Sequence, residues 1–240
     1  MREYVRDRRV WLALSGIVLL GAGLRLFGLD IQSLWNDELH AWAISAQKSI
    51  GGVVFLVALQ WEGHPPGYHM FLHCLEIFGN SEVILRLPSA ICGILSIIWI
   101  FLLGCRLFSW QEGLVASVLM AFSQCPIFYS QEARPYAFLI LFSIVTVYYW
   151  LSIVEHLQSN RKVKVYTILV YLLSSLICCY LHYYGLYLIF LQGVASFAFY
   201  CRTRKDVVCL GFIYAALILA YVPWTACVWG HLHGPTPNIP

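Results

Sequence analysis

The chain has 240 residues, of which 60% are hydrophobic and only 11% are charged, and its mean hydropathy is +0.74. A soluble domain of this size cannot bury so much apolar surface, so the composition indicates a polytopic α-helical membrane protein. The apolar runs are long and do not alternate, which argues against an outer-membrane barrel. The net charge of +3 comes from cations dispersed between these runs, so it points to topology and not to a nucleic-acid partner.

Seven apolar stretches approach the length of about 20 residues that a helix needs to cross a bilayer. We expect spans at Val10–Gly28, Ile84–Leu103, Leu114–Tyr129, Pro135–Val154, Val165–Leu181, Gly185–Tyr200 and Val207–Trp229. The predicted fold is therefore an all-α membrane domain of about seven transmembrane helices over residues 1–240. Its first outer loop, residues 29–83, is expected to carry two interfacial helices, at residues 36–48 and 66–79.

The stretch Pro65–Gly79 is apolar but short, and its polar residues His69, His73 and Glu76 fall on one helical face. Such a helix suits the membrane surface better than the lipid interior. If it does not cross and the N-terminus is cytoplasmic, eleven of the fifteen Lys and Arg residues lie on the cytoplasmic side. The outer side then collects seven of the eight histidines and most of the carboxylates. The ionisable groups thus converge on one face of the membrane.

The outer stretch W-N-D-E-L-H-A-W places Asn36 as a helix N-cap, with Asp37 and Glu38 in the first turn. The helix dipole favours carboxylates at that position. An ionised carboxylate beside a water-lined cavity can act as a general base or bind a metal. The alternative interpretation is that these acids only stabilise the helix N-terminus and have no catalytic or binding role.

Three further outer stretches carry polar groups next to predicted helix ends. In W-E-G-H-P-P-G-Y-H, Glu62 and His64 precede a Pro-Pro helix start, and helix N-termini favour phosphate. In Y-S-Q-E-A-R-P-Y-A, Glu132 and Arg134 lie beside lipid, where they need each other or a polar cavity. In Y-L-H-Y-Y-G, His182 and the tyrosines after it are candidates for binding sugar or phosphate. Each stretch also has a structural alternative. The first can be a simple loop-to-helix turn, the second an ion pair that caps two helices, and the third part of an interfacial tyrosine belt.

Five short motifs occur in order along the chain: W-x-D-E, H-P-P-x-Y, R-L-P-S (Arg86–Ser89), Y-S-Q-E-A-R-x-Y-A and H-Y. Their order resembles that of the family 39-like glycosyltransferases of the GT-C fold. This group includes the protein O-mannosyltransferases, the aminoarabinose transferase of lipid A and the lipopolysaccharide galacturonosyltransferases. The resemblance extends over roughly residues 24–193, which is most of the chain.

The resemblance implies an inverting glycosyltransferase that uses a polyprenyl-phosphate sugar on the non-cytoplasmic face. It favours a bacterial inner membrane, and an endoplasmic reticulum membrane would obey the same topology. The acceptor is then a hydroxyl of a lipid, a glycan or a protein, and membrane lipids surround the enzyme. Asp37 falls at the position of the general base, with Glu38 as its acidic companion and Glu132 at the second acidic position. Contacts to the donor phosphate or substrate are implied for a further set: His64, Arg134, Arg86, His182 and Tyr183. A divalent metal cation is the one cofactor implied, with Glu62, His64 and His182 as its candidate ligands.

Two other functions are compatible with the same residues. A transporter or flippase for a lipid-linked sugar also uses intramembrane charges, although the polar groups here gather at one face instead of the midplane. A non-catalytic family member that acts as a subunit is the other alternative. Longer relatives continue for several more spans, so we expect this chain to lack their C-terminal part or to need a partner chain.

Overall fold

The computed structural model describes residues 7–59, 64–159 and 161–233, and the side chains of residues 230–233 lie outside this description. Throughout these residues the regular structure is helical and no strand occurs, which confirms the all-α class. The chain divides into two compact units. Unit 1 comprises residues 1–41 and 75–145, and unit 2 comprises residues 42–74 and 146–240.

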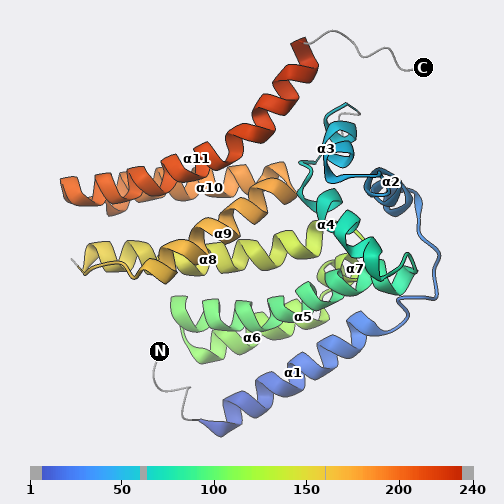
Figure 1. The fold of residues 1–240 in the computed structure, drawn as a ribbon. Coiled ribbons are helices and arrows are strands. Elements are labelled where there is room, and N and C mark those ends of the chain that lie inside the picture. The colour runs from blue at the N-terminus through green and yellow to red at the C-terminus, as the bar shows by residue number, and fades with distance from the viewer. Residues whose placement is uncertain (1–6, 60–63, 160, 234–240) are drawn as a thin grey trace. The chain divides into compact units, whose positions relative to one another are not determined.

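Unit 1 is built on α1 (Arg8–Leu26), α5 (Glu82–Leu107) and α6 (Trp110–Phe122), which pack side by side (Figure 1). Each of these helices begins at a side-chain cap, which satisfies a backbone N–H that the helix itself leaves unpaired. The caps are Asp7, Ser81 and Ser109, whose side chains accept from the backbone N–H groups of residues 9, 84 and 111. The chain therefore marks the helix starts locally.

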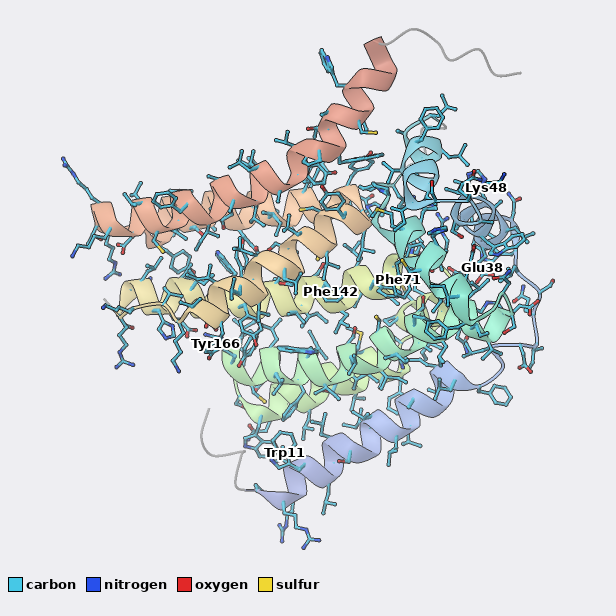
Figure 2. All side chains as sticks on the ribbon, viewed as in Figure 1. Trp11, Glu38, Lys48, Phe71, Phe142 and Tyr166 are labelled. Atoms are coloured by element: carbon cyan, nitrogen blue, oxygen red, sulfur yellow. The ribbon has the colours of Figure 1, made fainter. Side chains whose placement is uncertain are left out.

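The helices of unit 1 alternate in direction. Val10 and Leu14, near the start of α1, pack on Phe101 and Cys105, near the end of α5. Figure 2 shows Trp11 and Glu38 at opposite ends of this unit. The end of α1, the start of α5 and the residues that follow α6 consequently meet at the Glu38 end. Antiparallel packing thus brings together motifs that are far apart in the sequence.

Unit 2 contains α3 (Ile50–Leu59), α4 (Gly67–Leu75), α9 (Val165–Leu181), α10 (Tyr183–Ala195) and α11 (Arg204–His233), with a π-helical turn at Ser196–Tyr200. Most of α8 (Tyr136–Gln158) and the end of α2 (Asn36–Ser45) also belong to it. Val53 and Val57 of α3 join one apolar cluster with Tyr171, Leu210 and the other buried residues of α9–α11.

Large apolar side chains are exposed along the long helices, among them Leu19 of α1, Phe190 of α10 and Phe212 of α11. Soluble monomers rarely expose so much apolar surface, whereas a helix in lipid must. Within the described residues, five helices are long and apolar enough to cross a membrane: α1, α5, α8, α10 with its π-helical turn, and α11. The chain is a multi-pass membrane protein.

Two of the seven predicted spans differ from the prediction. The stretch predicted as one span at Leu114–Tyr129 is two helices, α6 and α7 (Gln124–Ser130), bent by 58° at Ser123, and counting this pair raises the described spans to six. Pro126, in the first turn of α7, has no N–H to continue the α6 ladder, which accounts for the break. The predicted span Val165–Leu181 is a helix with those bounds, but its 17 residues make it short for a span.

The predicted helices of the outer loop are present with slightly shorter bounds. Asn36–Ser45 corresponds to the predicted 36–48, and Gly67–Leu75 with a 3₁₀ turn at Glu76–Phe78 corresponds to 66–79. The helix α3 between them was not predicted. Its sequence, I-G-G-V-V-F-L-V-A-L, opens with two glycines and continues with β-branched residues, so its local preference for helix is weak. Its packing in unit 2 supplies the stabilisation that propensity does not.

Gly104 and Gly113 allow α5 and α6 to approach closely. A Cβ atom added to Gly104 would lie 2.7 Å from the Cα atom of Gly113. We expect Gly104→Ala to lower the free energy of unfolding by about 1–3 kcal/mol, because backbone must move to make room. Thermal unfolding in detergent measures this. Gly16→Ala is the matched control, since a Cβ there meets nothing within 4 Å; equal stability of the two variants would contradict the close crossing.

Candidate functional site

A buried ion pair joins the first outer helix to the start of α5. Arg86 donates from Nε to Oε1 of Glu38 over 2.9 Å and from Nη2 to Oε2 over 2.6 Å. Glu38 is 1% exposed and Arg86 is 4% exposed. This bidentate geometry is the strong form of the Arg–carboxylate interaction. Two charges buried to this degree are stable only because each satisfies the other.

The remaining donors of Arg86 hold the loop that follows α1. Nη1 donates to the carbonyls of Leu29 (2.9 Å) and Gln32 (2.7 Å), and Nη2 donates to that of Ser33 (3.3 Å). The loop turns at Gly28, whose φ of +76° favours glycine. Arg86 therefore uses its hydrogen-bonding capacity on the protein itself. Its predicted contact with donor phosphate stays a prediction, and these bonds favour a structural role.

Glu38 also binds the next outer loop. Its Oε1 accepts from the backbone N–H of Ala133 over 2.7 Å, and its Oε2 accepts from that of Trp35 over 3.2 Å. The carboxylate of Glu38 thus links α2, α5 and the loop between α7 and α8. Three of the five motifs recognised in the sequence meet at this one side chain.

Arg134 lies beside this junction with unused donor capacity. Its Nη1 donates to the backbone carbonyl of Asp37 over 3.2 Å, and its guanidinium carbon lies 5.9 Å from the centre of the Tyr136 ring. Arg134 is 6% exposed, yet its Nε has no hydrogen-bond partner among the described residues. Ser89 of the R-L-P-S motif donates to the carbonyl of Arg134 over 3.4 Å. This cation is held in place by its backbone, and its hydrogen-bonding capacity is only partly filled.

Asp37 differs sharply from its neighbour Glu38. It is half-buried in the first turn of α2, and over the described part of the chain its carboxylate makes no hydrogen bond or ion pair. Its backbone carbonyl accepts from Arg134. Of two adjacent carboxylates, one is therefore saturated by the fold and the other is available.

Glu132 is buried in an environment that disfavours its charge. The pKa of its carboxyl is raised to about 7, first by burial and then by the charges on Glu38 and Asp37, and the cations Arg134 and Arg86 only partly oppose this rise. A carboxylic acid with a pKa near 7 exchanges its proton readily at neutral pH. Glu132 therefore has the ionisation behaviour of a proton donor or acceptor.

Glu132, Glu38 and Arg86 line a cavity of about 300 Å³ in unit 1. Its other walls are Gly28, Gln32, Trp35, Phe128 and Gln131. The cavity is small by the standard of ligand sites, and its combination of ionisable and aromatic groups suits a polar ligand of modest size.

The other predicted site residues lie in unit 2. His64 and His182 meet edge to face, with 4.6 Å between their ring centres. Nδ1 of His182 accepts from the backbone N–H of Tyr184 over 3.0 Å and caps α10, so in its neutral form this imidazole carries its proton on Nε2. Tyr183 is more than a third exposed at the first residue of α10.

The metal hypothesis named Glu62, His64 and His182. Glu62 lies outside the described residues, and within the described ones no group of three or more His, Cys, Asp or Glu side chains could hold a metal ion. Of the three predicted ligands, the described structure therefore brings together the two imidazoles.

Breaking the buried pair should unfold this end of unit 1. We expect Arg86→Met to lower the free energy of unfolding by about 3–5 kcal/mol, because it leaves the Glu38 charge buried without its partner. Thermal unfolding in nanodiscs measures the loss. The control, Arg9→Met, removes an exposed arginine at the start of α1 and should change little. Similar midpoints for both variants would show that the pair is not a structural requirement.

The raised pKa of Glu132 predicts a definite pH dependence. As pH rises from 4.5 to about 7, the unfolded chain releases this proton while the folded chain retains it, so stability conferred at low pH is lost across that window. Glu132→Gln should abolish this loss, and the variant should gain on wild type as pH rises. Thermal midpoints from pH 4.5 to 8 test the expectation, with Glu82→Gln as the matched control. A constant difference across the range would contradict it.

Comparison with known protein families identifies the family of this chain. Residues 63–229 match the family model described as dolichyl-phosphate-mannose-protein mannosyltransferase. The match includes His64, Arg86, Glu132, Arg134 and His182, and it begins after Asp37 and Glu38. No curated protein and no solved structure matches the chain. The chain belongs to the dolichyl-phosphate-mannose-protein mannosyltransferase family and is a membrane glycosyltransferase of the GT-C type.

Proposed function

We propose that the protein transfers a sugar from a polyprenyl-phosphate donor to a hydroxyl group of a lipid, a glycan or a protein, with inversion at the anomeric carbon. The family supports a lipid-linked sugar donor. The observation that carries the assignment of the base is the contrast between the two neighbouring acids: the Glu38 carboxylate is saturated, whereas that of Asp37 is available beside a buried, underused arginine.

Asp37 acts as the general base in this proposal. It takes the proton of the acceptor hydroxyl while that oxygen forms a bond to the anomeric carbon. The bond between this carbon and the donor phosphate oxygen breaks, and the lipid phosphate leaves with the electron pair. A phosphate is a good leaving group, so no strong acid is needed on that side. A positioned base of this kind contributes about 10²–10⁴-fold to the rate.

Arg134 is the best candidate for stabilising the negative charge that develops on the leaving phosphate. Its guanidinium is buried and retains an unused N–H, and such preorganised donors stabilise charge strongly where water is excluded. Glu132 is partly protonated at neutral pH because of its raised pKa, so it can lie near an anionic donor without a full negative charge of its own. Glu38 then has a structural role, because its hydrogen bonds hold α2 against the start of α5 and the loop before α8.

His64, His182 and Tyr183 of unit 2 are the other proposed substrate contacts. The imidazole pair has hydrogen-bonding groups suited to phosphate or sugar oxygens. A divalent cation held by this pair with Glu62 remains part of the proposal. Dialysis against EDTA, followed by addition of Mg²⁺ or Mn²⁺ during assay, tests that part separately.

We place the reaction on the non-cytoplasmic face of the membrane, in a bacterial inner membrane. The positive-inside rule supports that orientation, because eleven of the fifteen Lys and Arg residues are cytoplasmic when the N-terminus is cytoplasmic and the seven predicted spans cross.

Loss of the Asp37 carboxylate should abolish turnover without unfolding the protein. We expect Asp37→Asn to reduce sugar transfer by about 10²-fold or more, the range for a general base, and to leave the thermal midpoint near that of wild type. The assay uses membranes with radiolabelled polyprenyl-phosphate sugars and scores transfer into lipid, glycan and protein fractions.

Asp30→Asn is the matched control, because Asp30 is an exposed aspartate in the same loop. Its transfer rate should equal that of wild type. Full activity in a correctly inserted Asp37→Asn protein would remove Asp37 as the base. Normal binding of the labelled donor, with no transfer by wild type to any fraction, would favour the transport or subunit alternatives.

A further inference from the structure

Arg25 is a buried arginine in a membrane-spanning helix, in a place where no carboxylate contacts it within the described chain. It lies in the last turn of α1 and is 0% exposed. A charge in this environment is costly unless polar groups compensate it. Its partners are backbone carbonyls: Nη2 donates to Met120 over 2.7 Å, and Nη1 donates to Ala121 and Gly21 over 3.0 Å each.

The carbonyls that Arg25 binds lie at the broken span. Met120 and Ala121 belong to the last turn of α6, where the chain bends by 58° into α7. The last four carbonyls of a helix have no partner within it, and the helix dipole makes that end negative. Arg25 supplies both hydrogen bonds and positive charge there, so a side chain of α1 caps the C-terminus of α6.

Gln131 makes the reciprocal contact at the other end of α7. Its Nε2 donates to the carbonyls of Leu24 (3.0 Å) and Phe27 (2.9 Å), at the end of α1. The end of α1 and the bent pair α6–α7 therefore cap each other. Glu132 follows Gln131 directly, and Ala133 donates its N–H to Glu38.

Gly93 of α5 packs against this arrangement from a third side. A Cβ atom at residue 93 would lie 2.8 Å from Cβ of Ser130 and 2.9 Å from Nε of Arg25, and it would collide with the Ser130 hydroxyl. The position of Arg25 is thus constrained by packing as well as by hydrogen bonds.

We propose that Arg25 and Gln131 form a reciprocal helix-end clamp that sets the direction of α7 and thereby positions Glu132 and Arg134 in the site. Arg25 is assigned no contact with substrate, and Gln131, although it lines the cavity, is assigned its role through its hydrogen bonds to α1, so both are positioning residues. The claim about turnover rests on the proposed function, whereas the claim about the placement of Glu132 does not.

Two readouts test the clamp in the full-length chain. The first is the titration of Glu132, obtained from the difference in thermal midpoint between each variant and the same variant carrying Glu132→Gln, from pH 4.5 to 8. The groups that act on Glu132 are Glu38, Asp37, Arg134 and Arg86, and all are retained. The second is the kcat and KM of sugar transfer.

Three variants disturb the clamp. Gln131→Leu removes both hydrogen bonds to α1 and keeps a similar side-chain volume. Gly93→Ala disturbs the packing against Arg25, and Arg25→Lys keeps the positive charge but loses the planar guanidinium that donates to several carbonyls. We expect the titration midpoint of Glu132 to move from about 7 toward 4.5 as its burial decreases. We expect kcat to fall by about 10²-fold, the cost of a displacement of roughly 1 Å, with KM little changed. Gly23→Ala, where a Cβ meets nothing within 4 Å, should behave as wild type.

A Glu132 titration that stays near pH 7 in all three variants would overturn the clamp, whatever their stability. Because Gln131 lies outside the membrane-spanning segments, Gln131→Leu keeps the test decisive if the arginine variant does not fold. A shifted titration with unchanged kcat would support the clamp and count against the proposed role of Glu132 in transfer. The failure of one proposal is therefore distinguishable from the failure of the other.

Discussion

The buried pair of Glu38 and Arg86 is the constraint on which the candidate site depends. Both charges are almost completely removed from water, so each must be satisfied by the other and by backbone groups. Those backbone groups come from the loop after α1 and from the loop before α8. The hydrogen bonds of one ion pair thereby fix the relative positions of the loop after α1, α2 and the loop before α8. Asp37 lies on α2, and Glu132 and Arg134 lie in the loop before α8.

The charged groups of unit 1 consequently divide into two kinds. Glu38 and Arg86 have their hydrogen bonds filled by the protein and contribute order. Asp37, Glu132 and Arg134 are held nearby with unused capacity, at a cost visible in the raised pKa of the Glu132 carboxyl and in the unpaired Nε of Arg134. Such underused polar groups in a well-supported surround are typical of sites that bind or transform a polar ligand.

The bent span shows how a membrane protein tolerates a break in a helix. In lipid the freed carbonyls of α6 would be costly, and a cation from α1 satisfies them, while Gln131 satisfies those of α1 in turn. Neither contact follows from local sequence, because both join residues about a hundred positions apart. The same limitation explains why α3 was not predicted: its glycines and β-branched residues have weak helix preference, and it is stabilised by packing within unit 2.

By itself the sequence determined the class of protein, the positions of most long helices and the family, because apolar length, capping residues and ordered motifs are local properties. It also singled out Asp37, Glu38, Arg86, Glu132 and Arg134 as candidates. The resemblance already placed Asp37 at the position of the base and Glu38 beside it. Only the tertiary structure decided which of the two carboxylates the protein's own hydrogen bonds occupy. Which of the two meets Arg86, and which is left available, depends on the antiparallel packing that brings α5 and the loop before α8 to the same end of the helices.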